Sequence, residues 1–356
     1  MKKLVLVTGT GRSGTSTMSG TLHHLGLFVP GPHLGANRSN PKGFFESTWA
    51  IRFHRKITTA AGIDFFDGRP GAFDRAQAAI TPELRRELVE FIRERSAGHD
   101  QVVVKDPRTV WAQALWHEAA TEAGLEICYI SMLRHPAEVV GSRRTYYVRS
   151  ENAARLRRYE VTSLARWVNG SIISERETRG HQRAFVKYVD LLTGWRPALE
   201  GLGRELGLRY NADISVGGPN PVDDFIDPDL RRHTVSWDDL EVPADLQDVA
   251  QAVWDDLVVL SERAGVDHDA SADLDVQAAR YGRVLDQAAA VSHDKIVAAR
   301  AEGRREGARK ARRRQARRRA RAEAASLDER RVGEVGGRDL AKVLWRRAQA
   351  RMPRHG

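Results

Sequence analysis

A glycine-rich loop near the N-terminus, Gly9–Ser16, has the residue types of an anion-binding site. The loop follows four apolar residues, Leu4–Val7, which predict a short buried strand, and it leads into a helix predicted over Thr15–Leu25. A glycine-rich turn at the start of a helix leaves backbone N–H groups unpaired, and these groups point at a ligand together with the positive end of the helix dipole. We therefore expect the loop to hold a phosphate or a similar anion.

The cation of this loop is not in its usual place. Gly9, four residues and Gly14 match the spacing of the phosphate loops of nucleotide-binding proteins, but Thr15 stands where those loops carry Lys, and the cation is Arg12 inside the loop. In nucleoside triphosphate enzymes that Lys reaches the β- and γ-phosphates, and the next hydroxyl holds magnesium. Without it, and with no evident acidic partner for a metal, the sequence favours sulfuryl transfer, because fixed Arg, Lys and backbone donors can stabilise the smaller charge of a sulfuryl group.

Charged residues also follow two further predicted strands. Lys105 and Asp106 follow the apolar run Val102–Val104, and Arg134 follows the run Glu126–Leu133. Ligands of open α/β sheets bind beyond the carboxyl ends of the strands, so these side chains are expected to face the same site as the loop. A guanidinium such as that of Arg134 matches a phosphate dianion in charge and in geometry.

Glu46 is the first candidate for a general base, because an alcohol acceptor needs a proton acceptor within hydrogen-bond reach. It stands after two aromatic residues and just before a helix predicted over residues 47–61. Asp106 is the reserve candidate. Each carboxylate also has a purely structural alternative: Glu46 could cap its helix, and Asp106 could pair with Lys105 or cap a helix that begins at Thr109.

Two motifs resemble those of the PAPS-dependent sulfotransferases, especially the Golgi and bacterial branches that carry Arg in the loop. One is the loop itself, and the other is Arg134 in an Arg-x-Pro helix start with Ser142 eight residues later. The cofactor of that family is 3′-phosphoadenosine-5′-phosphosulfate (PAPS), and the resemblance implies that Arg134 and Ser142 bind its 3′-phosphate. It also implies that six loop residues contact the 5′-phosphate and the sulfate: Gly11, Arg12, Ser13, Gly14, Thr15 and Ser16.

The segments around the candidate base extend this resemblance. Lys105-Asp106-Pro107 resembles the strand end of the tyrosylprotein sulfotransferases, which implies that Lys105 stabilises charge on the transferring sulfate. Cytosolic sulfotransferases carry a catalytic His at a comparable place, and its absence here moves the base to Glu46. The segment Asn40–Glu46 resembles one that is common in bacterial sulfotransferases and is placed like the acidic base of the tyrosylprotein branch.

The resemblance weakens toward the C-terminus. Tyr188 ends a fourth predicted strand, Ala184–Tyr188, and resembles the Tyr of the family's Tyr-Glu-x-Leu element, which implies that it lines the adenine. Asp190 stands one place later than the usual Glu. The segment Phe225–His233 resembles the post-core segment of bacterial members, whereas the Arg-Lys-Gly loop of the cytosolic family is missing.

The bulk composition is that of a soluble protein with one large domain and appendages. The 356 residues are 41% hydrophobic, and no apolar run approaches the ~20 residues that span a membrane. The chain enters its first predicted strand almost at once, so no signal peptide is expected and the protein is expected in the cytoplasm. The single cysteine, Cys128, lies in an apolar run, and neither a disulfide nor a cysteine-based metal site is expected.

Positive charge is concentrated at the C-terminal end. The net charge is +10, yet residues 301–356 alone carry 19 Lys and Arg against 7 Asp and Glu, so the rest of the chain is close to neutral. Between Val297 and Leu327 there is no Leu, Ile, Val, Phe, Met or Trp, which excludes a coiled-coil seam. The last predicted helix has the composition of an interfacial helix. Its apolar face is Leu340, Val343, Leu344 and Trp345, and the basic residues around this face are Lys342, Arg346, Arg347 and Arg351.

Three interpretations of the basic tail therefore stay open. It could bind an anionic membrane surface, which would place the protein at the inner membrane face, or it could be simply solvated. Nucleic acid is a weaker alternative, because no aromatic residues accompany the arginines.

We predict an α/β fold, namely a P-loop-type, mainly parallel sheet flanked by helices, with a C-terminal basic helical extension. A sulfotransferase domain is expected over residues 1–270, a basic helical extension over 271–330, and a linker with a short amphipathic basic helix over 331–356. Within the first domain, residues 82–96 and 249–264 predict helices and residues 64–81 predict a loop.

The predicted function is transfer of a sulfuryl group from PAPS to a hydroxyl acceptor without a metal. Glu46 would deprotonate the acceptor, while Arg12 and Lys105 would neutralise charge on the sulfate and the leaving phosphate. A carbohydrate or glycolipid is the favoured acceptor, and a small metabolite or a protein tyrosine is the alternative. Two other functions stay open: a P-loop kinase of a small metabolite, and a non-catalytic scaffold bound to membrane or nucleic acid.

Overall fold

The computed structural model describes residues 2–37, 40–148, 152–215, 217–226, 235–333, 341–342 and 344–345. The chain divides into two compact units, Met1–Asp286 and Gln287–Gly356. Most of the segment 225–233 and most of the predicted final helix lie outside the described residues.

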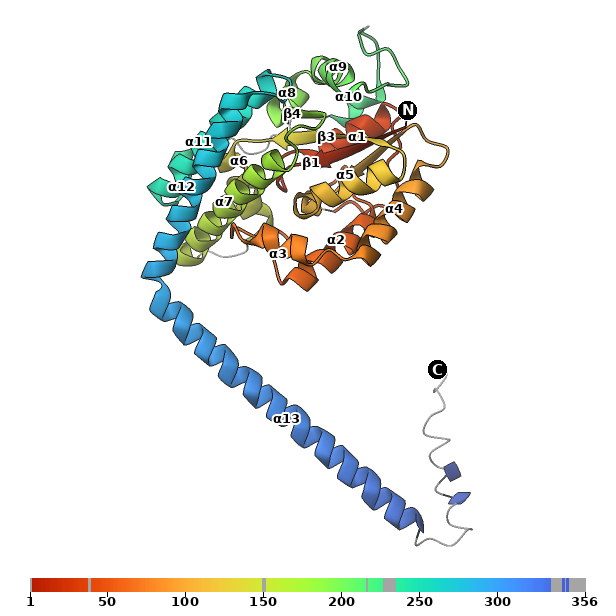
Figure 1. The fold of residues 1–356 in the computed structure, drawn as a ribbon, viewed down its shortest axis with the longest axis vertical. Helices are drawn as coiled ribbons and strands as arrows, with labels where there is room; N and C mark the ends of the chain where they lie inside the picture. Colours follow the sequence, from red (N-terminus) through yellow and green to blue (C-terminus); the bar gives the residue numbers. More distant parts are fainter. Residues whose placement is uncertain are drawn as a thin grey trace. The chain divides into compact units, whose positions relative to one another are not determined.

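The first unit is built on a sheet of four parallel strands in the order β2-β1-β3-β4 (Figure 1). The strands are β1 (Lys3–Thr8), β2 (Gln101–Lys105), β3 (Glu126–Leu133) and β4 (Arg183–Lys187). All residues of β1 are buried, which is typical of a central parallel strand covered on both faces and explains its nearly continuous apolar sequence. The predicted fold class, an α/β fold with a parallel sheet flanked by helices, is confirmed.

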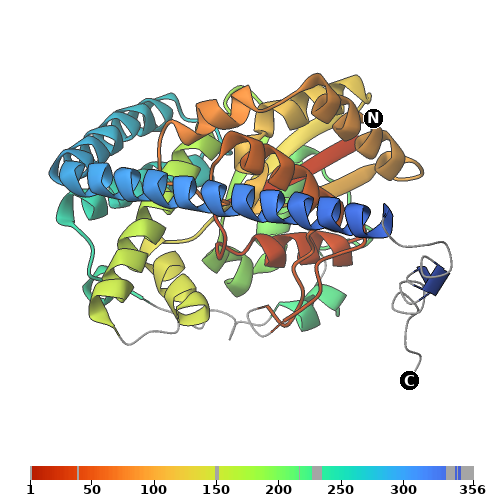
Figure 2. The same ribbon diagram turned by 90° about the horizontal axis from the view of Figure 1, so that it is seen from below.

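Helices cover both faces of this sheet (Figures 1 and 2). In the first half of the unit they are α1 (Thr15–His24), α2 (Thr48–Ala61), α3 (Ala72–Ala78), α4 (Pro82–Ser96), the 3₁₀ helix η1 (Pro107–Trp111), α5 (Gln113–Glu122) and α6 (Pro136–Tyr147). In the second half they are α7 (Ala153–Arg176), α8 (Tyr188–Thr193), α9 (Trp195–Leu206), α10 (Pro221–Phe225), the 3₁₀ helix η3 (Trp237–Asp239), α11 (Ala244–Glu262) and α12 (His268–Val291).

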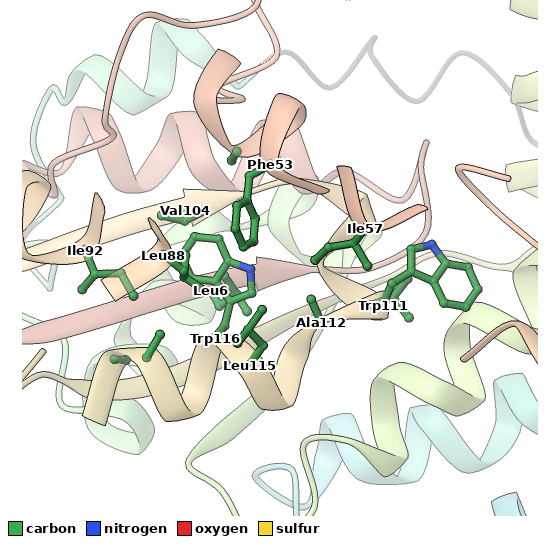
Figure 3. Packing of buried hydrophobic residues seen from close by; sticks show 14 of the residues in the cluster. Leu6, Phe53, Ile57, Leu88, Ile92, Val104, Trp111, Ala112, Leu115 and Trp116 are labelled. Carbon is green, nitrogen blue, oxygen red and sulfur yellow. The ribbon is translucent and has the colours of Figure 1, made fainter. Parts of the chain in front are cut away.

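The alternation of side chains along β1 separates two hydrophobic cores. Leu4 and Leu6 pack against α2, α4 and α5, where Phe53 and Trp116 lie beside Leu6 (Figure 3). Val5 and Val7 point to the opposite face, which α1, α8 and α9 cover. A third core joins α6, α7, α11 and α12 to the ends of β3 and β4. The sheet is therefore enclosed on both faces, and its carboxyl edge is free to carry a site.

Two elements differ from the sequence-based expectations. Residues 64–81 include a helix, α3, where a loop was expected, because its buried face is made of Ala72 and Ala76 and small residues give a weak hydrophobic periodicity. Lys187, not Tyr188, is the last residue of β4, and Tyr188 begins α8.

The first unit also continues beyond residue 270, where the sequence suggested its end. Leu274 and Tyr281, seven residues apart on one face of α12, are buried in the third core. The Tyr281 hydroxyl oxygen lies 2.5 Å from the carbonyl oxygen of Gly68 and 2.9 Å from that of Ala165, and it can donate its one proton to either. These contacts belong to distant segments, so the change in composition after residue 270 does not mark the end of the packed structure.

Most of the described part of the second unit is the long helix α13 (His293–Gly333), which follows the end of α12. Its side chains from residue 302 to residue 320 are all exposed. Among the residues that the structure describes, no helix combines the length and the apolar character needed to cross a bilayer.

Candidate functional site

A cavity opens at the carboxyl edge of the sheet, beyond the ends of β1, β2 and β3. It encloses about 1100 Å³ of empty space, part of it open to solvent, which is ample for a nucleotide-sized ligand. Its walls come from six segments that are separate in the sequence. They are Gly11, Arg12, Gly14, Thr15, Ser16, Thr17, Asn40, Pro41, Phe44, Glu46, Phe65, Phe66, Lys105, Pro107, Arg134, Ser142, Arg143, Tyr146, Tyr147 and Tyr188.

The Gly9–Ser16 loop needs glycine at positions 9 and 14, because other chain segments lie directly against the backbone there. A Cβ at Gly9 would come within 2.7 Å of the Met132 carbonyl oxygen on β3, and a Cβ at Gly14 would come within 2.2 Å of the Tyr188 ring. Gly14 is the N-cap of α1, with φ 90° and no side-chain cap, so the N–H groups of the first helical turn are left for a ligand.

Gly14→Ala should lower the free energy of unfolding by ~1–3 kcal/mol. The new methyl group would clash with the buried ring of Tyr188, and alanine would have to adopt the positive φ of Gly14. Urea denaturation measures this change. Gly282→Ala is the matched control, since this α12 glycine has nothing within 4 Å of the added Cβ, and there alanine should raise stability by ~0.5–1 kcal/mol. A Gly14→Ala protein as stable as the wild type would contradict the close seating of Tyr188.

Glu46 and Lys105 form a buried ion pair in the wall of the cavity. The Lys105 Nζ lies 2.5 Å from the Glu46 Oε1, and both side chains are almost fully buried. Lys105 stands at the end of β2, whereas Glu46 precedes α2. The Lys105 ammonium also donates to the Ser16 Oγ at 3.1 Å and the Phe44 carbonyl oxygen at 3.3 Å. The candidate base, the candidate sulfate-stabilising cation and a loop hydroxyl are thus brought together.

Asp106, the reserve candidate for the base, lies elsewhere. It is fully buried, does not line the cavity, and both of its carboxylate oxygens have partners. Its Oδ1 accepts from the backbone N–H of Arg108 at 2.9 Å and from its Nη1 at 2.7 Å, and its Oδ2 lies 2.9 Å from the Nδ1 of His54. Burial by itself raises the pKa of Asp106, but His54 and Arg108 outweigh it and hold the pKa below its usual value.

The partners of Asp106 give it a structural role at the end of β2. The Trp116 Nε1 donates to the His54 Nε2 at 2.8 Å, so the proton of a neutral His54 is on Nδ1 and is donated to Asp106. Lys105 and Asp106 do not pair with each other, because neighbouring side chains of a strand point to opposite faces.

A second group of polar contacts in the cavity wall joins Arg12 of the Gly9–Ser16 loop to Arg134 and Ser142. The Arg134 Nη1 donates to the Arg12 carbonyl oxygen at 3.2 Å, and its Nε donates to Glu138 at 2.9 Å. The Arg12 Nε donates to the Ser142 Oγ at 3.1 Å, and its guanidinium lies 4.3 Å from the centre of the Tyr146 ring. These contacts hold Arg12 at φ 77°, a conformation that non-glycine residues adopt mainly where surrounding structure requires it.

Of the remaining predicted site residues, Tyr188 lines the cavity and Ser13 does not. Tyr188 is buried in the wall, and burial raises the pKa of its hydroxyl. Ser13 does not line the cavity: its Oγ shares a hydrogen bond of 2.7 Å with the Thr10 Oγ1, and its N–H donates to the Thr10 carbonyl oxygen. Among the described residues, no group of three or more His, Cys, Asp or Glu is placed to hold a metal ion.

Sequence reasoning missed several residues of the wall, three of which lie against the Gly9–Ser16 loop. Arg143 donates to the Gly11 carbonyl oxygen from its Nε at 3.3 Å and its Nη2 at 3.1 Å. Phe66 lies against Gly11, where a Cβ would be 2.9 Å from the ring, and Tyr146 lies under Arg12. One signal was available: residues four apart share a helix face, so Tyr146 follows from Ser142.

Comparison with known proteins gives similar solved structures at low sequence identity. No protein-family model matches the chain, and no curated protein matches it. One similar solved structure is the sulfotransferase domain of the Synechococcus PCC 7002 olefin synthase, at 18% identity and a TM-score of 0.40, covering 75% of this chain and 95% of that one. Another is the sulfotransferase domain from the curacin biosynthetic pathway, at 16% identity and a TM-score of 0.38, covering 72% and 98%.

Proposed function

We propose that this protein transfers a sulfuryl group from PAPS to the hydroxyl group of an acceptor. The observation that carries the proposal is the composition of the cavity wall: the uncapped start of α1, three arginines and Lys105 surround one carboxylate, Glu46. An anion-binding wall with one carboxylate fits a highly charged ligand together with a single proton acceptor.

The wall offers a separate place for each part of the nucleotide. The N–H groups at the start of α1, with Arg12, would hold the 5′-phosphosulfate end. Arg134 and Ser142 would hold the 3′-phosphate, and Tyr188 would lie against the adenine. When bound, PAPS supplies the sulfuryl group and leaves as the 3′,5′-bisphosphate.

Glu46 and Lys105 would act on the two sides of the transfer. Glu46 accepts the proton of the acceptor hydroxyl as the oxygen attacks. An ammonium group has three N–H donors, and those of Lys105 have three partners: Glu46, Ser16 and the Phe44 carbonyl oxygen. Lys105 therefore reaches a sulfuryl oxygen by giving up one of them, and the bond to Phe44, the longest at 3.3 Å, is the first to be exchanged.

The acceptor side of the proposal rests on aromatic residues. Besides Phe44 and Tyr188, four aromatic residues line the cavity beside the charged groups: Phe65, Phe66, Tyr146 and Tyr147. Aromatic faces pack against the C–H face of a sugar while hydroxyl groups stay free to react, so we favour a carbohydrate or a glycolipid as the acceptor.

Isothermal titration calorimetry tests the nucleotide, with 3′,5′-diphosphoadenosine titrated without added metal and ATP titrated with magnesium. The product, 3′,5′-diphosphoadenosine, should bind much more tightly than ATP with magnesium, because Thr15 replaces the Lys that triphosphate enzymes use. Adenosine 5′-monophosphate is the matched control. Losing the 3′-phosphate should cost ~1.5–3 kcal/mol for each charged hydrogen bond that is lost. Equal affinity for the two adenosine nucleotides would contradict the proposal, and tighter binding of ATP with magnesium would favour a kinase.

A further inference from the structure

Three arginines among the described residues have buried side chains: Arg134 at 7% exposed, Arg143 at 4% and Arg183 at 6%. Two of them have a carboxylate partner, since Arg134 lies 2.9 Å from Glu138 and Arg183 lies 3.1 Å from Glu175. Arg143 differs: no carboxylate lies within 4.0 Å of it in the part of the chain that the structure describes. Burial of a cation without a counter-ion is unfavourable, so the exception needs an explanation.

The partners that Arg143 does have are neutral. Its Nε and Nη2 donate to the Gly11 carbonyl oxygen, and its Nη1 donates to the Ser163 carbonyl oxygen at 3.4 Å. Its guanidinium lies 4.6 Å from the centre of the Phe66 ring. A guanidinium has five N–H donors, so one on each terminal nitrogen is left, and Arg143 is part of the cavity wall.

The charge of Arg143 persists at neutral pH. Burial lowers the pKa of the Arg143 guanidinium to about 10, which still leaves it protonated near pH 7. Its neighbours act on this pKa in both directions: Tyr159 and Tyr147 raise it, whereas Arg166 and Arg12, which are cationic as well, lower it. The cavity thus contains a positive charge for which the described residues supply no carboxylate within 4.0 Å.

We infer that Arg143 is a ligand-binding residue whose counter-ion is a phosphate or sulfate group of the bound nucleotide. The two free N–H donors on its terminal nitrogens suit an oxyanion with two oxygens in reach, and the neighbouring Arg12 and Ser142 line the same part of the wall. Arg143 also fixes the Gly11 carbonyl oxygen, so one side chain would bind the anion and orient the loop. The nucleotide in this inference rests on the proposed function.

Binding measurements on the full chain test it with three variants. Arg143→Gln should weaken binding of 3′,5′-diphosphoadenosine by about 10- to 100-fold, the effect of losing a charged hydrogen bond. Arg143→Lys, which keeps the charge and loses the fork, should recover part of this affinity. Arg183→Gln is the matched control: it removes a buried arginine that has a carboxylate partner and does not line the cavity, so it should lower thermal stability and leave nucleotide affinity unchanged.

Adenosine 3′-monophosphate and 5′-monophosphate distinguish the two anionic groups. Whichever of them loses affinity in Arg143→Gln identifies the group that Arg143 holds. If Arg143→Gln and Arg143→Lys both bind all three nucleotides as tightly as the wild type, the inference is overturned. Should Arg143→Gln fail to fold, Arg143→Lys decides, because an unchanged affinity in that variant would exclude bidentate binding by the guanidinium.

Inorganic sulfate separates this inference from the proposed function. At constant ionic strength, replacing chloride with sulfate should raise the thermal midpoint of the wild type and of Arg183→Gln by more than that of Arg143→Gln, in which only the general effect of sulfate and the other anion-binding groups remain. If no adenosine nucleotide binds while this sulfate response holds, the nucleotide of the proposed function is wrong and the anion site at Arg143 stands. If sulfate stabilises Arg143→Gln as much as the wild type, the anion site is wrong.

Discussion

Replacing Glu46 with Gln should reduce turnover by ~10²–10⁴, the usual contribution of a general base, while nucleotide affinity does not fall. The amide keeps the size of the side chain and an oxygen that can accept from the Lys105 Nζ, which lies 2.5 Å from the Glu46 Oε1. The variant loses the ability to take a proton from the acceptor. It also leaves the charge of Lys105 without its carboxylate, which favours an anionic ligand.

Steady-state release of 3′,5′-diphosphoadenosine and calorimetry with the same nucleotide measure the two effects separately. Glu87→Gln is the control, because Glu87 pairs with Lys56 on the surface and lies outside the cavity. Normal turnover in Glu46→Gln would mean that the base lies elsewhere. Asp106→Asn should mainly reduce stability, because it removes the charge that accepts hydrogen bonds from Arg108 and His54.

Removing residues 298–356 should abolish binding to anionic vesicles and leave activity on a soluble acceptor unchanged. The unit that carries the cavity ends at Asp286, before the truncation. Residues 304–321 contain 11 Lys and Arg, and each basic residue near an anionic surface contributes ~1 kcal/mol, so losing three contacts already weakens binding by about 100-fold. The attraction fades within ~8 Å at physiological salt, and raising the salt should reproduce the truncation in part.

Cosedimentation with vesicles of mixed neutral and anionic lipids measures this binding. In the full chain, Arg317, Arg318 and Arg319 changed together to Gln should weaken it, whereas the same three changed to Lys should not. Trp345, which is 64% exposed, should contribute the binding that survives high salt. A full-length protein that ignores anionic vesicles at low salt would contradict the membrane role. Tight, salt-sensitive binding to nucleic acid in the same assay would identify that polyanion as the partner instead.

Local sequence patterns were sufficient to predict the buried strands of this protein and the edge of the sheet that carries the cavity. Buried parallel strands require nearly continuous apolar runs, so the run at Leu4–Val7 and the run at Glu126–Leu133 were recognisable without any tertiary information. Parallel strands bring their carboxyl ends to one edge, so Lys105 and Arg134 could be expected beside the Gly9–Ser16 loop, and both line the same cavity as that loop. These are consequences of backbone geometry and of spacing along the chain.

Side-chain pairing across long distances was decided by the tertiary structure. The sequence ranked Glu46 before Asp106 as the base but did not show their surroundings. Asp106 is enclosed by Arg108 and His54, whereas Glu46 meets Lys105 in the wall of the cavity. The same holds for Arg143, because its burial without a carboxylate depends on where Gly11 and Ser163 come to lie. Periodicity and spacing describe one element at a time, and they carry no information on which side chains from separate elements share a low-dielectric space.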